Sequence, residues 1–232
     1  MKIGIMQPYF FPYIGYWQLI HSVDKYVIYD DVNYIKGGWI NRNQILMNGK
    51  PKMINLKMDG ASSNKLIYEI NVANDKIYIE KLLRTIRHCY AKAPYFSDVF
   101  SLIEEIIYFD NLNIAIYLAN SINKIADYIG IKTEFLISSN IRKNDDLKGE
   151  DKIIDICKNL NASEYYNAIG GIKLYSPERF DYNGIQLKFL KTIDVEYTQN
   201  IDKFIPNLSI IDVMMFNSKE KIREFLNSYV LL

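Results

Sequence analysis

Two adjacent carboxylates, Asp30 and Asp31, follow an apolar run at 26–29 that is typical of a buried strand. Ligands of open α/β sheets bind beyond the carboxyl ends of the strands, which is where a general base or a divalent-metal ligand is expected. Successive strand residues point to opposite faces, so both acids reach one site only if the strand has already ended. The alternative is a turn acid with a solvated neighbour.

A proline-bounded aromatic segment at 7–13 lies between an apolar run at 2–6 and a helical pattern at 14–22. The free amides of a helix N-terminus can receive an anion at this position. Gln7 and Tyr9 are therefore candidates for substrate binding. The alternative is a rigid corner of proline and aromatic side chains packed into the core.

The loop at 36–43 combines glycines with side chains that suit a nucleotide or a sugar. Lys36 and Arg42 carry charges that fit phosphate, Trp39 offers a stacking surface, and Asn43 adds an amide. We predict that these four residues contact substrate. The alternative is a flexible loop that leads into a hairpin.

His88 is the candidate general base, because histidine titrates near neutrality and few other groups do. A single helical histidine is also compatible with a purely structural role.

Gly170 and Gly171 form a turn after a predicted strand, and Tyr175 follows four residues later; all three are candidates for substrate binding. That turn either presents backbone amides to a phosphate or simply reverses the chain.

The elements that must position these residues alternate between strand and helix. The first 31 residues are predicted as strand, loop, helix and strand, which opens a parallel α/β sheet. Asn48-Gly49 between two apolar segments predicts a hairpin, and 67–72 predicts a further strand. Residues 75–129 are helical by periodicity, with Asp110 as the expected cap of the last helix. We predict an α/β fold with a mostly parallel central sheet, helices on both faces and a helical segment at about 75–129.

The composition bounds the class of protein. The chain has 232 residues, with 28 basic and 27 acidic side chains, and we expect one domain over residues 1–232. The near-neutral charge argues against a nucleic-acid binder, and no apolar run is long enough for a membrane span. The two cysteines, Cys89 and Cys157, form no metal or disulfide pattern, which favours the reducing cytoplasm.

The sequence resembles the WbqC-like protein family over nearly its whole length. The resemblance is carried by segments 5–16, 29–32, 36–43, 92–96, 167–171, 174–175, 197–199 and 204–212. Their order and spread make the match specific, although none is a mechanistic signature. The resemblance implies a cytoplasmic protein of bacterial surface-polysaccharide (O-antigen) assembly.

We therefore expect an enzyme that transfers an acyl or aminoacyl group to the amino group of a nucleotide-linked sugar. His88 is predicted as the base, with Asp30 and Asp31 beside it, while Lys36 and Arg42 hold the diphosphate. The expected donor is an acyl-carrier protein or a coenzyme A thioester, with no metal and no tightly bound cofactor. The alternatives are a metal-dependent nucleotidyl or glycosyl transferase, in which the two aspartates hold the ion, and a non-catalytic scaffold of a biosynthetic complex.

Overall fold

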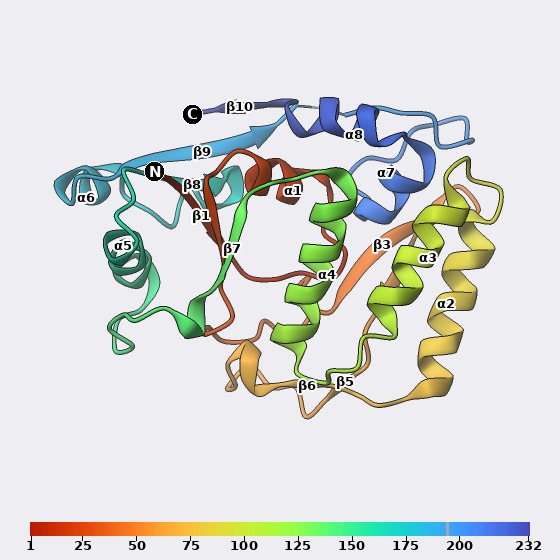
Figure 1. Cartoon of the computed structure of the whole chain (residues 1–232), viewed down its shortest axis with the longest axis horizontal. Helices are drawn as coiled ribbons and strands as arrows, with labels where there is room; N and C mark the ends of the chain where they lie inside the picture. The colour runs from red at the N-terminus through yellow and green to blue at the C-terminus, as the bar shows by residue number, and fades with distance from the viewer. Residues whose placement is uncertain (194) are drawn as a thin grey trace.

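The computed structural model describes residues 1–193 and 195–232 and contains a six-stranded sheet in the order β10-β9-β8-β1-β2-β7 (Figure 1). The strands are β1 (Lys2–Met6), β2 (Lys25–Ile28), β7 (Glu134–Ile137), β8 (Glu164–Ala168), β9 (Gln186–Thr192) and β10 (Tyr229–Leu231). All neighbours pair in parallel except β9 and β10, which are antiparallel. The predicted mostly parallel sheet is confirmed.

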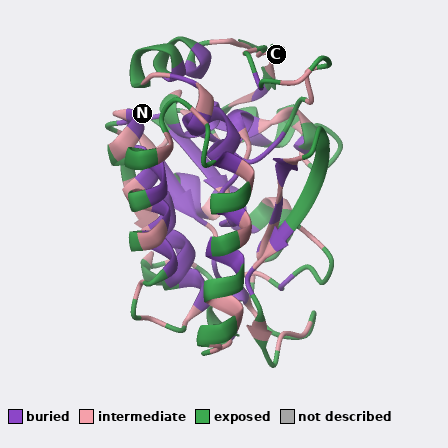
Figure 2. Ribbon diagram, turned by 90° about the vertical axis from the view of Figure 1, so that its right-hand side faces the viewer, coloured by how far each residue is buried: buried purple, intermediate pink, exposed green. Residues whose placement is uncertain are grey.

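Helices cover both faces of this sheet, as predicted. On one face α5 (Gly149–Asn159) and α6 (Pro177–Tyr182) pack with the side chains of Ile3, Ile5 and Val27. On the other face α1 (Ile14–His21), α4 (Ile114–Ile129), α7 (Ile210–Phe216) and α8 (Lys219–Leu226) share the larger cluster with Tyr26 and Ile28. The alternation along β2 is the ordinary strand period. Figure 2 shows the buried residues on the sheet and on the helix faces turned toward it.

The helical segment at 75–129 consists of α2 (Lys76–Tyr90), α3 (Phe96–Ile107) and α4, and it lies on the side of the sheet opposite α5 and α6 (Figure 1). The expected cap at Asp110 is wrong. Asn113 caps α4 instead, because its side chain accepts hydrogen bonds from the amides of Ala115 and Ile116 at 3.1 and 3.2 Å.

The predicted hairpin is confirmed by β3 (Arg42–Met47) and β4 (Lys50–Asn55). Asn48 and Gly49 have φ values of 51° and 71°, the left-handed pair that a tight hairpin turn requires. The strand expected at 67–72 is largely wrong. A 3₁₀ turn occupies Ile67–Glu69, and only β6 (Asn71–Val72) pairs with β5 (Met58–Asp59). Two further 3₁₀ turns, Ser138–Asn140 and Ile169–Gly171, follow β7 and β8. None of the helices described is both long and apolar enough to cross a bilayer.

A fully buried carboxylate, Asp212 on α7, links the helices to the loop that follows β9. It accepts hydrogen bonds from the hydroxyls of Tyr90 and Tyr197, both at 2.7 Å, and from the Gln199 amide at 2.8 Å. The Tyr90 hydroxyl in turn accepts the Leu46 amide at 3.0 Å, which brings in β3. One side chain of α7 thereby joins α2, β3 and the loop that follows β9.

Tyr197→Phe should lower the free energy of unfolding by about 1–3 kcal/mol, because it removes a buried hydrogen bond to a carboxylate and leaves an acceptor short of a partner. Tyr182→Phe is the matched control, since Tyr182 is 91% exposed and its hydroxyl is already solvated. Urea denaturation of both variants measures the effect. Equal unfolding midpoints for the two variants would contradict it.

Candidate functional site

The ends of β1, β2 and β7 meet at one edge of the sheet. Met6 is in register with Ile28, and Ile28 with Ile137, so the segments that begin at Gln7, Tyr29 and Ser138 leave the sheet together. Gln7, Asp30 and Asp31 therefore lie at the same edge of the sheet, since each follows the carboxyl end of a parallel strand.

A polar pocket of about 470 Å³ lies beyond β2 and β7, and we call it the lysine pocket. Residues from segments 29–33, 66–68 and 139–152 line it, and they include Asp31, Ser139 and the lysines at 143, 148 and 152. The N-terminus of α5 forms part of its wall through Gly149.

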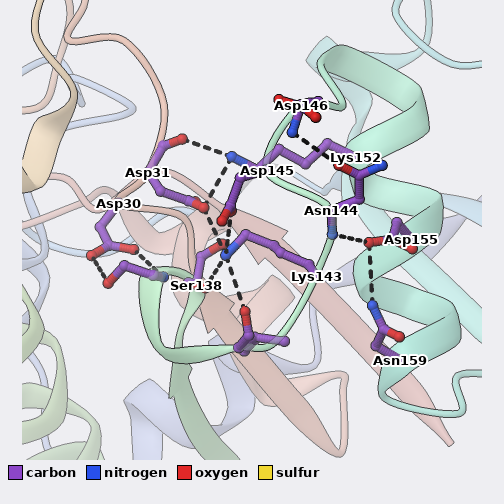
Figure 3. Close-up of polar contacts among 12 residues, drawn as sticks. Asp30, Asp31, Ser138, Lys143, Asn144, Asp145, Asp146, Lys152, Asp155 and Asn159 are labelled. Atoms are coloured by element: carbon purple, nitrogen blue, oxygen red, sulfur yellow. Dashed lines mark hydrogen bonds and ion pairs between the residues drawn. The ribbon is translucent and has the colours of Figure 1, made fainter.

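Asp31 is buried between two ammonium groups (Figure 3). One carboxylate oxygen lies 2.8 Å from Lys143 Nζ and 2.9 Å from Lys152 Nζ, and Lys152 also donates to the Asp31 carbonyl at 2.9 Å. The Lys143 side chain is 2% exposed and the Lys152 side chain 8%. Burial raises the pKa of the Asp31 carboxyl, but hydrogen bonds, led by the one from Lys143, outweigh burial and hold that pKa below its usual range.

The loop between β7 and α5 is held so that Lys143 points inward. The amide of Asn144 donates to Asp155 on α5 at 2.9 Å, and the Asn144 side chain accepts the Asp146 amide at 3.0 Å (Figure 3). The Lys143 ammonium also donates to the carbonyls of Ser138 and Ile141. The ammonium therefore combines two hydrogen bonds to carbonyls with its ion pair to Asp31.

Asp30 occupies a different environment from its neighbour. Its two oxygens accept the Ser139 amide at 2.9 Å and the Ser139 hydroxyl at 2.7 Å, and the residue is 2% exposed. Burial raises the pKa of the Asp30 carboxyl above its usual range, and the hydrogen bonds from Ser139 only partly offset this. Asp30 does not itself line the pocket, but its hydrogen-bond partner Ser139 does.

The two carboxylates do not form a metal-binding pair. Asp30 turns to Ser139, whereas Asp31 turns to two ammonium groups that would repel a divalent cation. This geometry weighs against the metal-dependent transferase considered from the sequence.

Part of the predicted substrate site gathers at a second hollow of about 340 Å³, here called the aromatic hollow. It is lined by Tyr9, Pro12, Tyr13, Trp39, Asn43 and Asn207. Trp39 is 45% exposed, and the Arg42 guanidinium lies over its ring at 5.8 Å from the centroid. None of these residues lines the lysine pocket, so the structure divides the predicted site in two.

Two of the polar candidates in the 36–43 loop have structural contacts. The Asn43 amide donates to the carbonyls of Phe10 and Phe11 at 3.1 and 2.7 Å and holds the turn in which Phe11 has a φ of 46°. Arg42 donates to the carbonyls of Gly37 and Gly38 within its own loop. Its guanidinium is therefore engaged away from the lysine pocket.

The remaining substrate candidates do not share one cavity. Lys36 is exposed, and neither it nor Gln7 lines the lysine pocket or the aromatic hollow. Gly170 and Gly171 lie in a 3₁₀ turn that lines neither cavity, and Gly171 leaves room for the Asn167 side chain.

Tyr175 packs in the core of the α5–α6 face. Its ring lies edge-on against Tyr165 and Phe180, with centroids 5.7 and 5.9 Å away. This packing accounts for the half-buried state of Tyr175 without a ligand.

His88 is not brought together with the aspartates. It lies exposed on α2, which packs against α3 and β3, and it lines neither the lysine pocket nor the aromatic hollow. The role of base that we predicted for it has no geometric support at the edge of the sheet where Asp30 lies.

The lysines and Ser139 are the site residues that sequence reasoning missed. Their signal was present, because a mainly polar segment at 138–149 follows the apolar run at 135–137 and precedes an apolar helical pattern at 150–160. The rule that singled out Asp30 applies equally to this second strand end.

The fold and the pocket define an open α/β protein with a pocket at the carboxyl ends of its parallel strands, where ligands of such sheets bind. Within that class the chain belongs to the WbqC-like protein family, whose model matches residues 7–224. It is 26% identical over 231 residues to the uncharacterized protein Rv1507c of Mycobacterium tuberculosis, a match that covers 93% of each chain. No solved structure matches significantly.

Asp31→Asn should lower the free energy of unfolding by about 3–5 kcal/mol at neutral pH, because it leaves two buried ammonium groups facing each other. Lys152→Met should cost clearly less, since one carboxylate then balances one ammonium group. Chemical denaturation of both variants tests this order, and an equal or larger loss in Lys152→Met would contradict it.

The loss in Asp31→Asn should also depend on pH. Because the folded-state pKa of Asp31 is lowered, its stabilisation is present above the unfolded-state pKa of about 3.9 and is lost as the pH falls through the folded value. The difference from wild type should therefore shrink below about pH 4. A difference that stays constant down to about pH 2 would count against the charge-balance explanation.

Proposed function

We propose that the chain is an enzyme of bacterial surface-polysaccharide assembly that transfers an acyl or aminoacyl group to the amino group of a nucleotide-linked sugar. The family resemblance supplies the setting. The observation that supports the chemistry is a buried carboxylate, Asp30, which is hydrogen-bonded to Ser139, a residue that lines the lysine pocket. We place the reaction in the cytoplasm, where nucleotide-linked sugars are made.

The chemical problem is that an amino sugar at neutral pH is largely an ammonium ion, which has no free electron pair for attack. In this proposal the Ser139 hydroxyl accepts a proton from the ammonium and passes its own proton to Asp30. A carboxyl of raised pKa is a better acceptor than an ordinary one. The positive charge of the neighbouring lysines lowers the pKa of the bound amine and favours its neutral form.

The neutral amine then attacks the thioester carbonyl of a coenzyme A or acyl-carrier-protein donor. A C–N bond forms and the C–S bond breaks as the tetrahedral intermediate collapses. The second proton of the amine leaves with the departing thiolate, and Asp30 releases the first proton to solvent. The products are an amide and a free thiol.

Asp30→Asn and Ser139→Ala should each lower turnover by about 10²–10⁴-fold, the usual contribution of a positioned base. His88→Ala should keep the wild-type rate, because His88 lies apart from the pocket. The assay is amide formation on UDP-linked amino sugars with a panel of coenzyme A thioesters, with thermal melts as a check of folding. A folded Asp30→Asn variant of wild-type rate, or a large loss in His88→Ala, would reject this assignment.

The rate should fall on the acid side of the pH profile, because a protonated Asp30 cannot accept a proton. The apparent pKa of that limb should lie above the ordinary value of about 3.9. The limb should be absent from the residual activity of Asp30→Asn. Persistence of the same limb in that variant would assign it to another group.

A further inference from the structure

Two buried ammonium groups of the lysine pocket share one carboxylate. Lys143 and Lys152 are both at least nine-tenths buried, and both contact the carboxylate of Asp31. Asp145 lies 3.8 Å from Lys143 Nζ, but its side chain is 84% exposed and screened by solvent. The neighbouring buried carboxylate, Asp30, is hydrogen-bonded to Ser139, so Asp31 is the one buried carboxylate among the described residues that contacts these two ammonium groups.

Hydrogen bonds supply no second carboxylate to these two ammonium groups. Lys143 donates to two carbonyls, and Lys152 donates to the Asp31 carbonyl and faces the Tyr29 ring at 5.5 Å. A buried charge without an ion-pair partner of its own remains costly. Two buried ammonium groups that share one carboxylate in the wall of an open pocket are therefore suited to a negatively charged ligand.

The wall itself offers contacts for such a ligand. No side chain among the described residues caps the N-terminus of α5, and its first residue, Gly149, lines the pocket. The free amides of a helix's first turn are donors for an anion. The exposed side chain of Lys148 lies at the same place. The acids of that first turn, Glu150 and Asp151, pair with Arg179 on α6. Their charge is thereby partly neutralised away from the pocket.

We propose that the lysine pocket binds a phosphate or diphosphate group, with Lys148 and the α5 amides in contact with it and the Asp31-bound lysines supplying the field behind it. The identity of the phosphate carrier rests on the proposed function. A nucleotide-linked sugar and coenzyme A both contain a diphosphate. The phosphate site itself needs neither assignment.

The test is calorimetric titration of the full-length protein with inorganic pyrophosphate. Wild type should bind it with an affinity that weakens as NaCl is raised. Lys148→Ala and Lys152→Met should each weaken binding about tenfold or more, the usual effect of losing a charge-assisted contact or a nearby charge. Lys132→Ala is the matched control and should bind pyrophosphate as wild type does. Lys132 is an exposed lysine just before β7, so it lies at the amino end of that strand, whereas the pocket lies beyond the carboxyl end.

Competition against pyrophosphate identifies the carrier. UDP-N-acetylglucosamine and coenzyme A are each titrated against bound pyrophosphate, and the one that displaces it more strongly is the one whose diphosphate occupies the pocket.

The proposal is overturned if pyrophosphate fails to bind at millimolar concentration, or if Lys148→Ala and Lys132→Ala bind it equally well. The two proposals can fail separately. Lysine-dependent binding of pyrophosphate without any amide formation would support the phosphate site and reject the proposed function. Amide formation that is insensitive to Lys148 would support the proposed function and reject the phosphate site.

Discussion

The arrangement of one buried carboxylate between two buried ammonium groups is the constraint on which the site depends. Asp31 stands at the end of β2, Lys143 on the loop after β7, and Lys152 in the first turns of α5. Two segments more than a hundred residues apart in the chain, the end of β2 and the stretch from 143 to 152, must meet for these charges to be compensated at all. Since an unpaired buried charge costs several kcal/mol, the ion cluster fixes where the β7–α5 loop and the α5 N-terminus lie against the sheet.

The two neighbouring aspartates show how environment, and not residue type, sets the chemistry. Asp31 faces ammonium groups, which keep it ionised and lower its pKa. Asp30 is one residue away but accepts only neutral donors from Ser139, and burial raises its pKa. The first carboxylate is thereby suited to hold cations in place, and the second to take up a proton. Adjacent groups whose environments separate their pKa values are a common basis for acid–base roles.

Away from this edge, polar side chains of types that often bind substrates instead stabilise turns, loops and helix contacts. Asn43 holds the turn at Phe10 and Phe11, and Arg42 closes its own loop. Asp212 joins α7 to α2 and to the loop after β9. Amides, guanidinium groups and carboxylates satisfy backbone atoms as readily as they bind ligands, so their types alone do not separate the two uses.

The sequence by itself determined the parallel α/β class, the Asn48-Gly49 hairpin and the meeting of Gln7 with Asp30 at one edge, because these follow from local periodicity, turn chemistry and strand direction. It also determined the family, since the motifs keep their order along the chain. Tertiary structure alone decided that His88 lies apart from the pocket, that Trp39 and Asp31 line different cavities, and that three lysines line the same pocket as Asp31. These outcomes depend on which loops pack together across more than a hundred residues, and no local pattern encodes that packing.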